Sequence, residues 1–153
     1  MLDKGIKIIK FSPQYTDEVI KLIDASLKRM GIIPKSNELI DDEDLFKIPQ
    51  VYKEKGRFWI ALRNKHVIGI VAIQDLGNNK AKLNRMFVEY KYHGGGLGQK
   101  LLDVAINFAK NEEFKELILN TYLTMKRAHN FYNKNGFKRI GEDKENYHYK
   151  LEL

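Results

Sequence analysis

The most constraining feature of this sequence is a cluster of four glycines within residues 94–98. A pattern typical of a β-strand precedes it, and a pattern typical of an amphipathic helix begins at Leu97. Glycine costs backbone entropy and offers no side chain, so glycines at a helix start indicate that something approaches the main chain closely. The unpaired N–H groups and the dipole of a helix N-terminus favour an anion, and the cluster therefore predicts a phosphate cradle.

Two well-known phosphate-binding patterns do not fit these glycines. A dinucleotide fingerprint requires G-x-G-x-x-G, but the residue three after Gly96 is Gln99. A nucleotide P-loop requires Ser or Thr after its Gly-Lys, but Lys100 is followed by Leu101. The cradle is therefore of another kind, and a flexible turn without a ligand is the alternative.

Residues 57–88 predict an antiparallel meander. Strand-like runs at 57–62, 66–76 and 80–88 are separated by the short turns Arg-Asn-Lys and Gly-Asn-Asn. In the last run one alternating set comprises Ala81, Leu83, Arg85 and Phe87, and the other comprises Lys82, Asn84, Met86 and Val88. We expect the two sets on opposite faces of a central strand.

Before the meander, a strand is expected at 6–11, followed by a helix that starts at Ser12 or Thr16. Its apolar stripe, expected to face a core, comprises Ile20, Ile23, Leu27 and Met30. Residues 31–40 then form a linker. Residues 41–56 predict a short helical region that Pro49 interrupts and Gly56 ends, either as a wall of a substrate pocket or as plain cover for a sheet.

After the glycines, one helix is expected from Leu97 to about Asn111 and another from Met125 to a stop at Asn135-Gly136. The stripe of the first comprises Leu97, Leu101, Ala105, Phe108 and Ala109. The remaining strands are expected at 115–121, 137–142 and 146–153.

Two motifs lie in order in this region. Val88 ends a strand and is followed by His93-Gly94-Gly95-Gly96-Leu97-Gly98, similar to [Q/R]-x-x-G-x-[G/A]. The second is similar to A-x-x-[F/L]-Y-x-x-x-G-F and comprises Ala128, Phe131, Tyr132, Gly136 and Phe137. Together they resemble the acyl-CoA-binding segments of the GNAT superfamily of N-acetyltransferases, a resemblance that covers residues 57–140.

The resemblance implies an α/β fold with one N-acetyltransferase domain spanning residues 1–153. Its mixed, mostly antiparallel sheet of about seven strands would be flanked by about four helices and splayed between the fourth and fifth strands, so that the pantetheine arm of acetyl-CoA enters like an extra strand. The implied cofactor-binding residues are Met86, Phe87, Val88, His93, Gly94, Gly95, Gly96, Leu97, Gly98, Gln99, Met125, Ala128, Phe131 and Tyr132. No metal is implied.

The resemblance also assigns catalytic roles to two residues. The Met86 N–H would polarise the thioester, and Tyr132 would protonate the departing thiolate. The general base is open, because many relatives place Glu where this chain has Lys82. Glu89, Asp75, an ordered water or loss of the amine proton to solvent are alternatives.

Three further positions depart from the family pattern. His93 replaces the usual Gln or Arg, Tyr90 stands where proline is common, and Met125 replaces a CoA-contacting Asn. His93 can still donate an N–H to a phosphate, with a surface turn residue as the alternative, and Met125 would make only an apolar contact.

Composition narrows the function classes. The chain has no cysteine, which excludes a thiol acyl-enzyme and zinc–thiolate sites and fits a reducing compartment. Its histidines and serines lie in neither H-E-x-x-H nor G-x-S-x-G patterns. Because no apolar run is long enough for a membrane span or export signal, we expect a cytoplasmic protein without a membrane partner.

We therefore expect an N-acetyltransferase that moves an acetyl group from acetyl-CoA to a primary amine by direct attack in a ternary complex. The acceptor and the oligomeric state, a homodimer included, stay open. One alternative is a catalytically weak CoA-binding regulatory module, suggested by Lys82 and His93. The other is a nucleic-acid-associated protein, suggested by the net charge of +7, although no basic stretch is both long and interleaved with aromatics.

Overall fold

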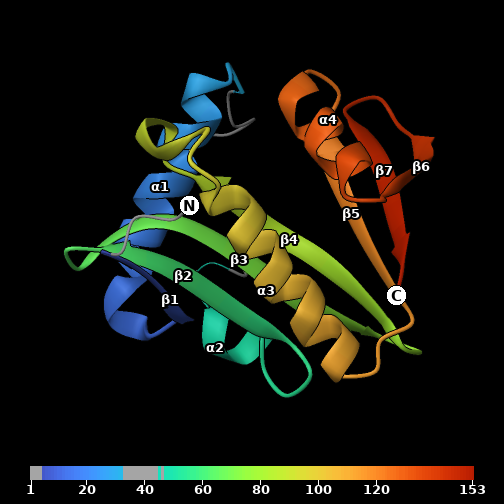
Figure 1. Ribbon diagram of the computed structural model, residues 1–153, viewed down its shortest axis with the longest axis horizontal. Helices are drawn as coiled ribbons and strands as arrows, with labels where there is room; N and C mark the ends of the chain where they lie inside the picture. The colour runs from blue at the N-terminus through green and yellow to red at the C-terminus, as the bar shows by residue number, and fades with distance from the viewer. Residues whose placement is uncertain (1–4, 33–44, 46) are drawn as a thin grey trace.

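The computed structural model describes residues 5–32, 45 and 47–153 of the 153-residue chain. Its strands form one seven-stranded sheet in the order β1-β2-β3-β4-β5-β7-β6 (Figure 1). The strands are β1 (Ile6–Lys10), β2 (Arg57–Arg63), β3 (His66–Gly77), β4 (Lys80–Val88), β5 (Glu116–Tyr122), β6 (Lys138–Glu142) and β7 (Asn146–Glu152). The α-helices in the described residues are α1 (Thr16–Arg29), α2 (Ile48–Val51), α3 (Leu97–Asn111) and α4 (Lys126–Lys134). The predicted fold class is confirmed.

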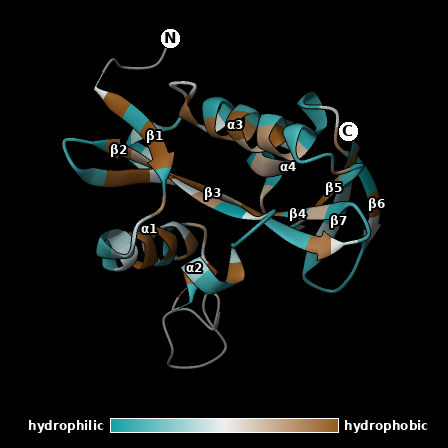
Figure 2. Cartoon of the chain, turned by 90° about the horizontal axis from the view of Figure 1, so that it is seen from below, coloured by the Kyte–Doolittle hydropathy of each residue, from teal (hydrophilic) through white to brown (hydrophobic). Residues whose placement is uncertain are grey.

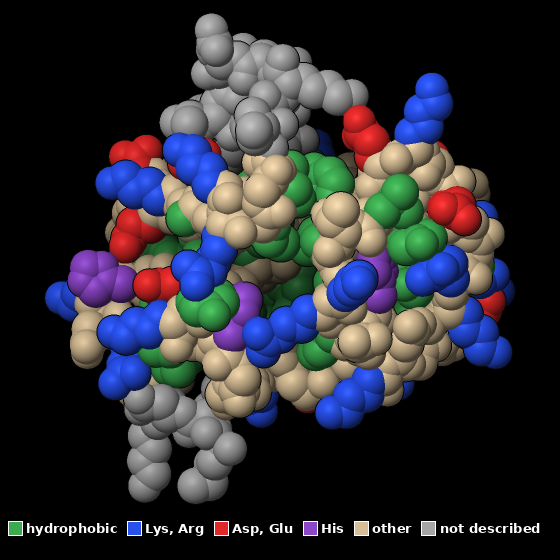
Figure 3. Space-filling model, turned by 90° about the horizontal axis from the view of Figure 1, so that it is seen from above, with side chains coloured by type: hydrophobic (Ala, Val, Ile, Leu, Met, Phe, Trp, Pro, Cys, Tyr) green, Lys and Arg blue, Asp and Glu red, His purple; other side chains and the backbone are tan. Residues whose placement is uncertain are grey.

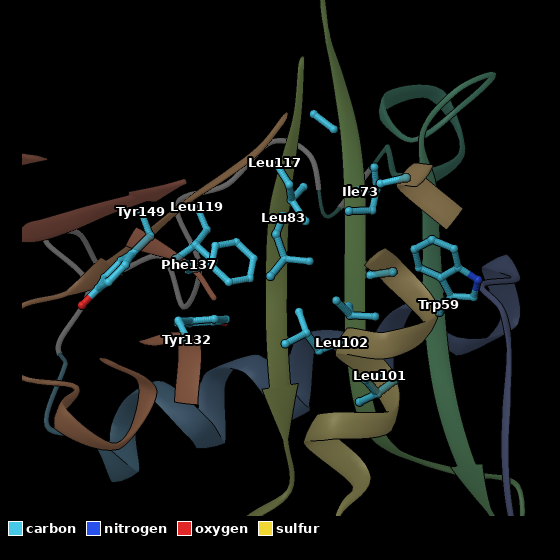
Figure 4. Close-up of a cluster of buried hydrophobic side chains, with 14 of the residues drawn as sticks. Trp59, Ile73, Leu83, Leu101, Leu102, Leu117, Leu119, Tyr132, Phe137 and Tyr149 are labelled. Carbon is cyan, nitrogen blue, oxygen red and sulfur yellow. The ribbon is translucent and has the colours of Figure 1, made fainter. Parts of the chain in front are cut away.

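The helices cover the two faces of the sheet unequally. Figure 2 shows α3 and α4 on one face and α1 and α2 on the other. A hydrophobic cluster lies on the α3 side, where Leu101 and Leu102 of α3 pack beside Leu83 of β4 (Figure 4). A second cluster lies on the α1 side, around Ile23 and Phe58. Within the described part of the chain, no helix is long and apolar enough to cross a membrane.

The meander of β2, β3 and β4 is antiparallel, as predicted. Its turns depend on residues that tolerate a left-handed backbone: Asn64 and Lys65 have φ values of 50° and 66°, and Asn78 and Asn79 have values of 53° and 62°. Asparagine adopts this conformation more readily than most residues, which is why the short turns could be predicted from the sequence.

The predicted alternation along β4 is wrong in its second half. The pairing with β3 moves from Ala72 opposite Asn84 to Ile70 opposite Phe87, so β4 carries one extra residue there. Arg85 lies in this bulge with φ of 57°. An extra residue reverses the faces of all later side chains. Met86 and Val88 therefore pack on the α3 side with Ala81 and Leu83, whereas Phe87 packs on the α1 side.

The sheet forks between β4 and β5. These parallel strands pair only where Lys80–Lys82 lies opposite Glu116–Ile118. Beyond this short ladder the strands separate, and Figure 1 shows the two halves of the sheet diverging toward the top. The predicted splay between the fourth and fifth strands is confirmed, and it leaves one side of β4 from Asn84 onward without a neighbouring strand.

The N-terminal helical region differs from the prediction in two details. Val19, Leu22 and Ile23 form the buried face of α1, while Ile20 and Leu27 lie at its edge and Met30 lies outside the cluster. Pro49 lies in the first turn of α2, where its missing N–H costs nothing, so it starts the helix instead of interrupting it. The rest of the predicted linker and helix, residues 33–44 and 46, lies outside the described residues.

Candidate active site

The glycine segment forms an exposed turn that ends in the N-terminus of α3. Gly96 is the N-cap residue with φ of 90°, and Gly94 has φ of 82°, both in the left-handed region that favours glycine. The first bond of α3 runs from the Lys100 N–H to the Gly96 carbonyl. Within the described part of the chain, the backbone N–H groups of Gly94–Gln99 donate to no protein acceptor. Such a run of free donors at a helix N-terminus fits a phosphate group.

The space in front of these N–H groups is open. A Cβ placed on Gly94 or Gly96 would meet no described atom within 4 Å. A Cβ on Gly98 would make only ordinary contacts, 3.8 Å from Met86 Cε and 3.9 Å from Val88 Cγ2. Packing therefore does not explain these three glycines, and their bare backbone suits a ligand that lies against it.

The open edge of β4 presents backbone hydrogen-bonding groups to the fork. The Glu89 N–H donates to the Ile68 carbonyl of β3 at 2.8 Å, and Phe87 lies opposite Ile70 in the same register. Since backbone groups alternate in direction along a strand, those of Met86 and Val88 point the other way, toward the fork. The backbone of Phe87 thus pairs with β3, and its side chain packs in the α1-side cluster.

The imidazole of His93 closes part of this edge. Its Nε2 lies 2.8 Å from the Val88 carbonyl oxygen, and its Nδ1 lies 3.3 Å from Arg127 Nη1 at the start of α4. Because a carbonyl only accepts and a guanidinium only donates, this arrangement suits the tautomer of His93 that carries its proton on Nε2. The centre of the imidazole lies 5.2 Å from that of the Tyr90 ring, and the Arg29 guanidinium lies 3.1 Å from the same Tyr90 ring centre.

Gln99 uses its side chain to join the two helices that flank the fork. Its amide pairs reciprocally with that of Asn135, at 2.8 Å and 3.1 Å, and also donates to Asp103 at 2.9 Å. The Gln99 side chain therefore makes its hydrogen bonds with Asp103 of α3 and Asn135 at the end of α4. Its free backbone N–H is what it offers to the cradle.

The wall of the fork opposite β4 comes from α4 and the residue before it. Ala128 and Phe131 are half-buried against the α3-side cluster, and Met125 Sδ lies 3.6 Å from the Thr121 hydroxyl oxygen. Tyr132 is 6% exposed and lies beside Phe137 and Tyr149 (Figure 4). Burial raises the pKa of the Tyr132 phenol above its usual range, because a phenolate would lose its hydration. The phenol therefore keeps its proton throughout the physiological range.

The side chains considered as general base do not converge on Met86. The Asp75 carboxylate accepts the Gly77 N–H at 2.8 Å. Asp75 lies opposite Ala81, about 13 Å along the strand from Met86 at roughly 3.3 Å per ladder position, one β4 residue being the extra residue of the bulge. Glu89 lines a separate groove of about 550 Å³ beside α1. Neither placement favours a direct proton transfer at the fork.

Sequence reasoning missed three residues of this region. Arg127 contacts His93, Asn135 pairs with Gln99, and His129 is buried, its Nδ1 2.9 Å from the Tyr149 hydroxyl and its Nε2 3.2 Å from the Leu123 carbonyl. Arg127 and His129 flank Ala128 of the second motif, which could have drawn attention to them. Their partners are set by tertiary packing, and no local pattern indicates them.

Seen from above, the fork is a hollow in the molecular surface. Figure 3 shows hydrophobic side chains inside it and Lys, Arg and His side chains around its rim. An apolar interior, a cationic rim and free backbone donors at a helix N-terminus suit a long ligand with an apolar arm and a phosphate group. The fold and the site thus define an α/β protein with a split sheet, whose fork suits a ligand of this kind.

Comparisons with known proteins define the family. The sequence profile of the acetyltransferase (GNAT) domain matches residues 54–139. The crystal structure of an acetyltransferase from Streptococcus agalactiae superposes with a TM-score of 0.89 at 28% identity, covering 99% of this chain and 100% of that one. This chain belongs to the GNAT acetyltransferase family.

Two further relatives extend the comparison. A Bacillus anthracis protein, described as a streptothricin acetyltransferase, was solved with acetyl-CoA bound; it has a TM-score of 0.60 at 26% identity, over 66% of this chain and 64% of that one. N-acetylaspartate synthetase from Danio rerio is 34% identical over 89 residues, which are 58% of this chain and 32% of that protein. The match thus spans about a third of the length of this curated relative.

Proposed function

We propose that this chain is an N-acetyltransferase that transfers the acetyl group of acetyl-CoA directly to a primary amine. The observation that carries the proposal is a pair of backbone sites at the fork: the open edge of β4 at Met86 and Val88, and the N–H groups of Gly94–Gln99, which have no acceptor within the described part of the chain. Family membership supports it, as does the acetyl-CoA bound to the Bacillus anthracis relative.

In this proposal the chain holds its cosubstrate mainly through backbone. The N–H groups of Gly94–Gln99 bind the pyrophosphate, reinforced by the dipole of the 15-residue helix α3. The backbone groups of Val88 pair with the pantetheine arm as a neighbouring strand would. The side chains of Met125, Ala128 and Phe131 line the opposite wall, and the His93 imidazole leaves the Val88 carbonyl to make room.

The chemistry requires one bond to form and one to break. The lone pair of the amine attacks the thioester carbon, and the Met86 N–H stabilises the negative charge that develops on the carbonyl oxygen. The C–N bond forms as the C–S bond breaks, and the amine loses its extra proton to water, because no described carboxylate lies at Met86. The chain contains no cysteine that could form a thiol acyl-enzyme, which is why the proposed transfer is direct.

Tyr132 supplies the proton that the departing thiolate takes up. Its raised pKa keeps the hydroxyl protonated but also makes it a weaker acid. Proton donation must therefore accompany cleavage of the C–S bond, when negative charge grows on the sulfur. Water then restores the proton of Tyr132.

The direct test combines a binding measurement and a turnover measurement. Calorimetry should show one acetyl-CoA site per chain, and thiol release from acetyl-CoA should depend on an added primary amine. Binding without amine-dependent thiol release would instead support a regulatory CoA-binding module. No binding at millimolar acetyl-CoA would overturn the proposal.

A further inference from the structure

The acceptor has to reach the fork from the face that the cosubstrate does not use. The cradle lies at the start of α3, and the side chains of Met86 and Val88 lie on the α3 side of the sheet. On the other side, no described helix covers β5, β7 and β6 (Figure 2). If the chain is an N-acetyltransferase, on which this inference rests, its amine approaches from this α1 side of the fork.

Lys82 lies at the base of the fork on the acceptor side. It is the last β4 residue paired with β5, between Gln74 of β3 and Ile118 of β5. Its strand neighbours Ala81 and Leu83 are buried in the α3-side cluster, so its own side chain points to the α1 side. Lys82 is half-buried and makes no ion pair or hydrogen bond within the described part of the chain.

Two described carboxylates near the fork on this face, those of Glu116 and Asp143, already have partners. Glu116 lies 3.3 Å from Lys80 Nζ and 3.7 Å from Lys150 Nζ. Asp143 accepts two backbone N–H groups, at 2.8 Å and 2.9 Å, and lies 3.0 Å from His148 Nε2. These hydrogen bonds hold the pKa of the Asp143 carboxyl below its usual range, so the group stays charged and bonded to these partners.

Two neutral amides, Asn84 and Asn120, also lie near the fork on this face. Asn84 donates to the Gln74 side-chain oxygen at 2.9 Å, and Asn120 lies against the imidazole of His148. Among the residues that the structure describes, Lys82 is therefore a half-buried cation without an ion-pair partner, and in such a partly desolvated place an opposite charge interacts more strongly than in water.

We propose that Lys82 selects acceptor amines that carry a negatively charged group, in the simplest case a carboxylate. Met86 lies four residues beyond Lys82, and because one of these is the extra residue of the bulge, the two are about 10 Å apart along the strand. An ion pair with the Lys82 ammonium takes up about 3 Å of this distance. The carboxylate should therefore lie roughly 5–7 Å from the reacting nitrogen, as in a linear amino acid or a short peptide.

Three amines of equal length test this charge preference: 4-aminobutyrate, 4-aminobutanamide and 1,4-diaminobutane. The wild-type protein should use 4-aminobutyrate with a kcat/KM about tenfold or more above that of 1,4-diaminobutane. Lys82→Met should raise the KM for 4-aminobutyrate by about tenfold and leave the KM for acetyl-CoA unchanged. Lys82→Glu should reverse the order of the three amines.

Lys80→Met is the matched control, because Lys80 lies two residues earlier on the same face and is paired with Glu116. It should leave the order unchanged. A wild-type preference for 1,4-diaminobutane, or an unchanged order of the amines in Lys82→Glu, would overturn this inference. The proposed function would still stand as long as any amine causes thiol release from acetyl-CoA. If none of the three amines turns over, their affinities for the CoA-saturated protein give the same comparison, and no selective binding of 4-aminobutyrate also overturns the inference.

Discussion

The imidazole of His93 lies 2.8 Å from the carbonyl oxygen of Val88 and occupies a backbone group that we assign to the cosubstrate. The same imidazole contacts Arg127 on α4, so one side chain links β4 to the opposite wall of the fork. Binding of the pantetheine arm along β4 requires this link to open.

Removal of the imidazole should therefore speed cosubstrate binding. We predict that His93→Ala raises the association rate constant for acetyl-CoA by about two- to tenfold, the equivalent of one net hydrogen bond. Stopped-flow binding separates this result from the alternative role of His93 as a phosphate ligand. In that case the dissociation rate constant would rise and the association rate constant would not.

The cradle is best tested at Gly98, because its backbone is not left-handed and its Cβ position is free of clashes. Gly98→Glu should abolish acetyl-CoA binding, since a carboxylate would face the pyrophosphate. Gly98→Ala is the control for folding and should retain the thermal stability of the wild-type protein. Calorimetric binding by a folded Gly98→Glu protein with wild-type affinity would show that no phosphate lies there.

Tyr132→Phe keeps the ring in its packed position and removes only the proton donor. We predict that kcat and kcat/KM fall together by roughly ten- to a thousandfold, with acetyl-CoA affinity unchanged. Tyr149→Phe is the matched control, because it loses the contacts with His129 and Arg139 and should reduce stability but not turnover. Full activity of Tyr132→Phe would remove this residue from the mechanism.

The buried phenol of Tyr132 also predicts a pH dependence of stability. Its folded-state pKa is raised above the unfolded value near 10, so the folded state holds this proton more tightly. The resulting contribution to the free energy of unfolding is fully present below about pH 10 and is lost as the pH rises toward the folded-state pKa. A rise in pH from about 9 to about 11.5 should therefore lower the free energy of unfolding more for the wild-type protein than for Tyr132→Phe. Urea unfolding at each pH measures this difference. Parallel curves for the two proteins would contradict the assignment.

Much of the fold was predictable because its signals are local. The turn at Asn78-Asn79 uses residues suited to a left-handed backbone, and the apolar period of α3 gave its end at Asn111. The fork between β4 and β5 is not a local feature. It was expected only because the glycine motif and the motif around Tyr132 resemble those of a family whose sheet is splayed.

The face reversal along β4 was not predictable from the sequence. Its cause is the left-handed backbone of Arg85, a residue type that gives no signal for a bulge. The contacts of His93 with Arg127 and of Gln99 with Asn135 join residues more than thirty positions apart. Tertiary packing creates them, so neither spacing nor residue type could indicate the partner.

The central claim, that acetyl-CoA lies along the open edge of β4 and against the start of α3, is tested most directly by residue-resolved amide hydrogen exchange. Addition of acetyl-CoA should slow exchange at Met86, Val88 and Gly94–Gln99. Among the described residues, the N–H groups of Gly94–Gln99 have no acceptor, and those of Met86 and Val88 are on the side of β4 that faces the fork. Phe87 is an internal control, because its amide already faces β3 and should change little. Protection confined to the groove beside α1, or no protection at the cradle in saturated protein, would contradict the account.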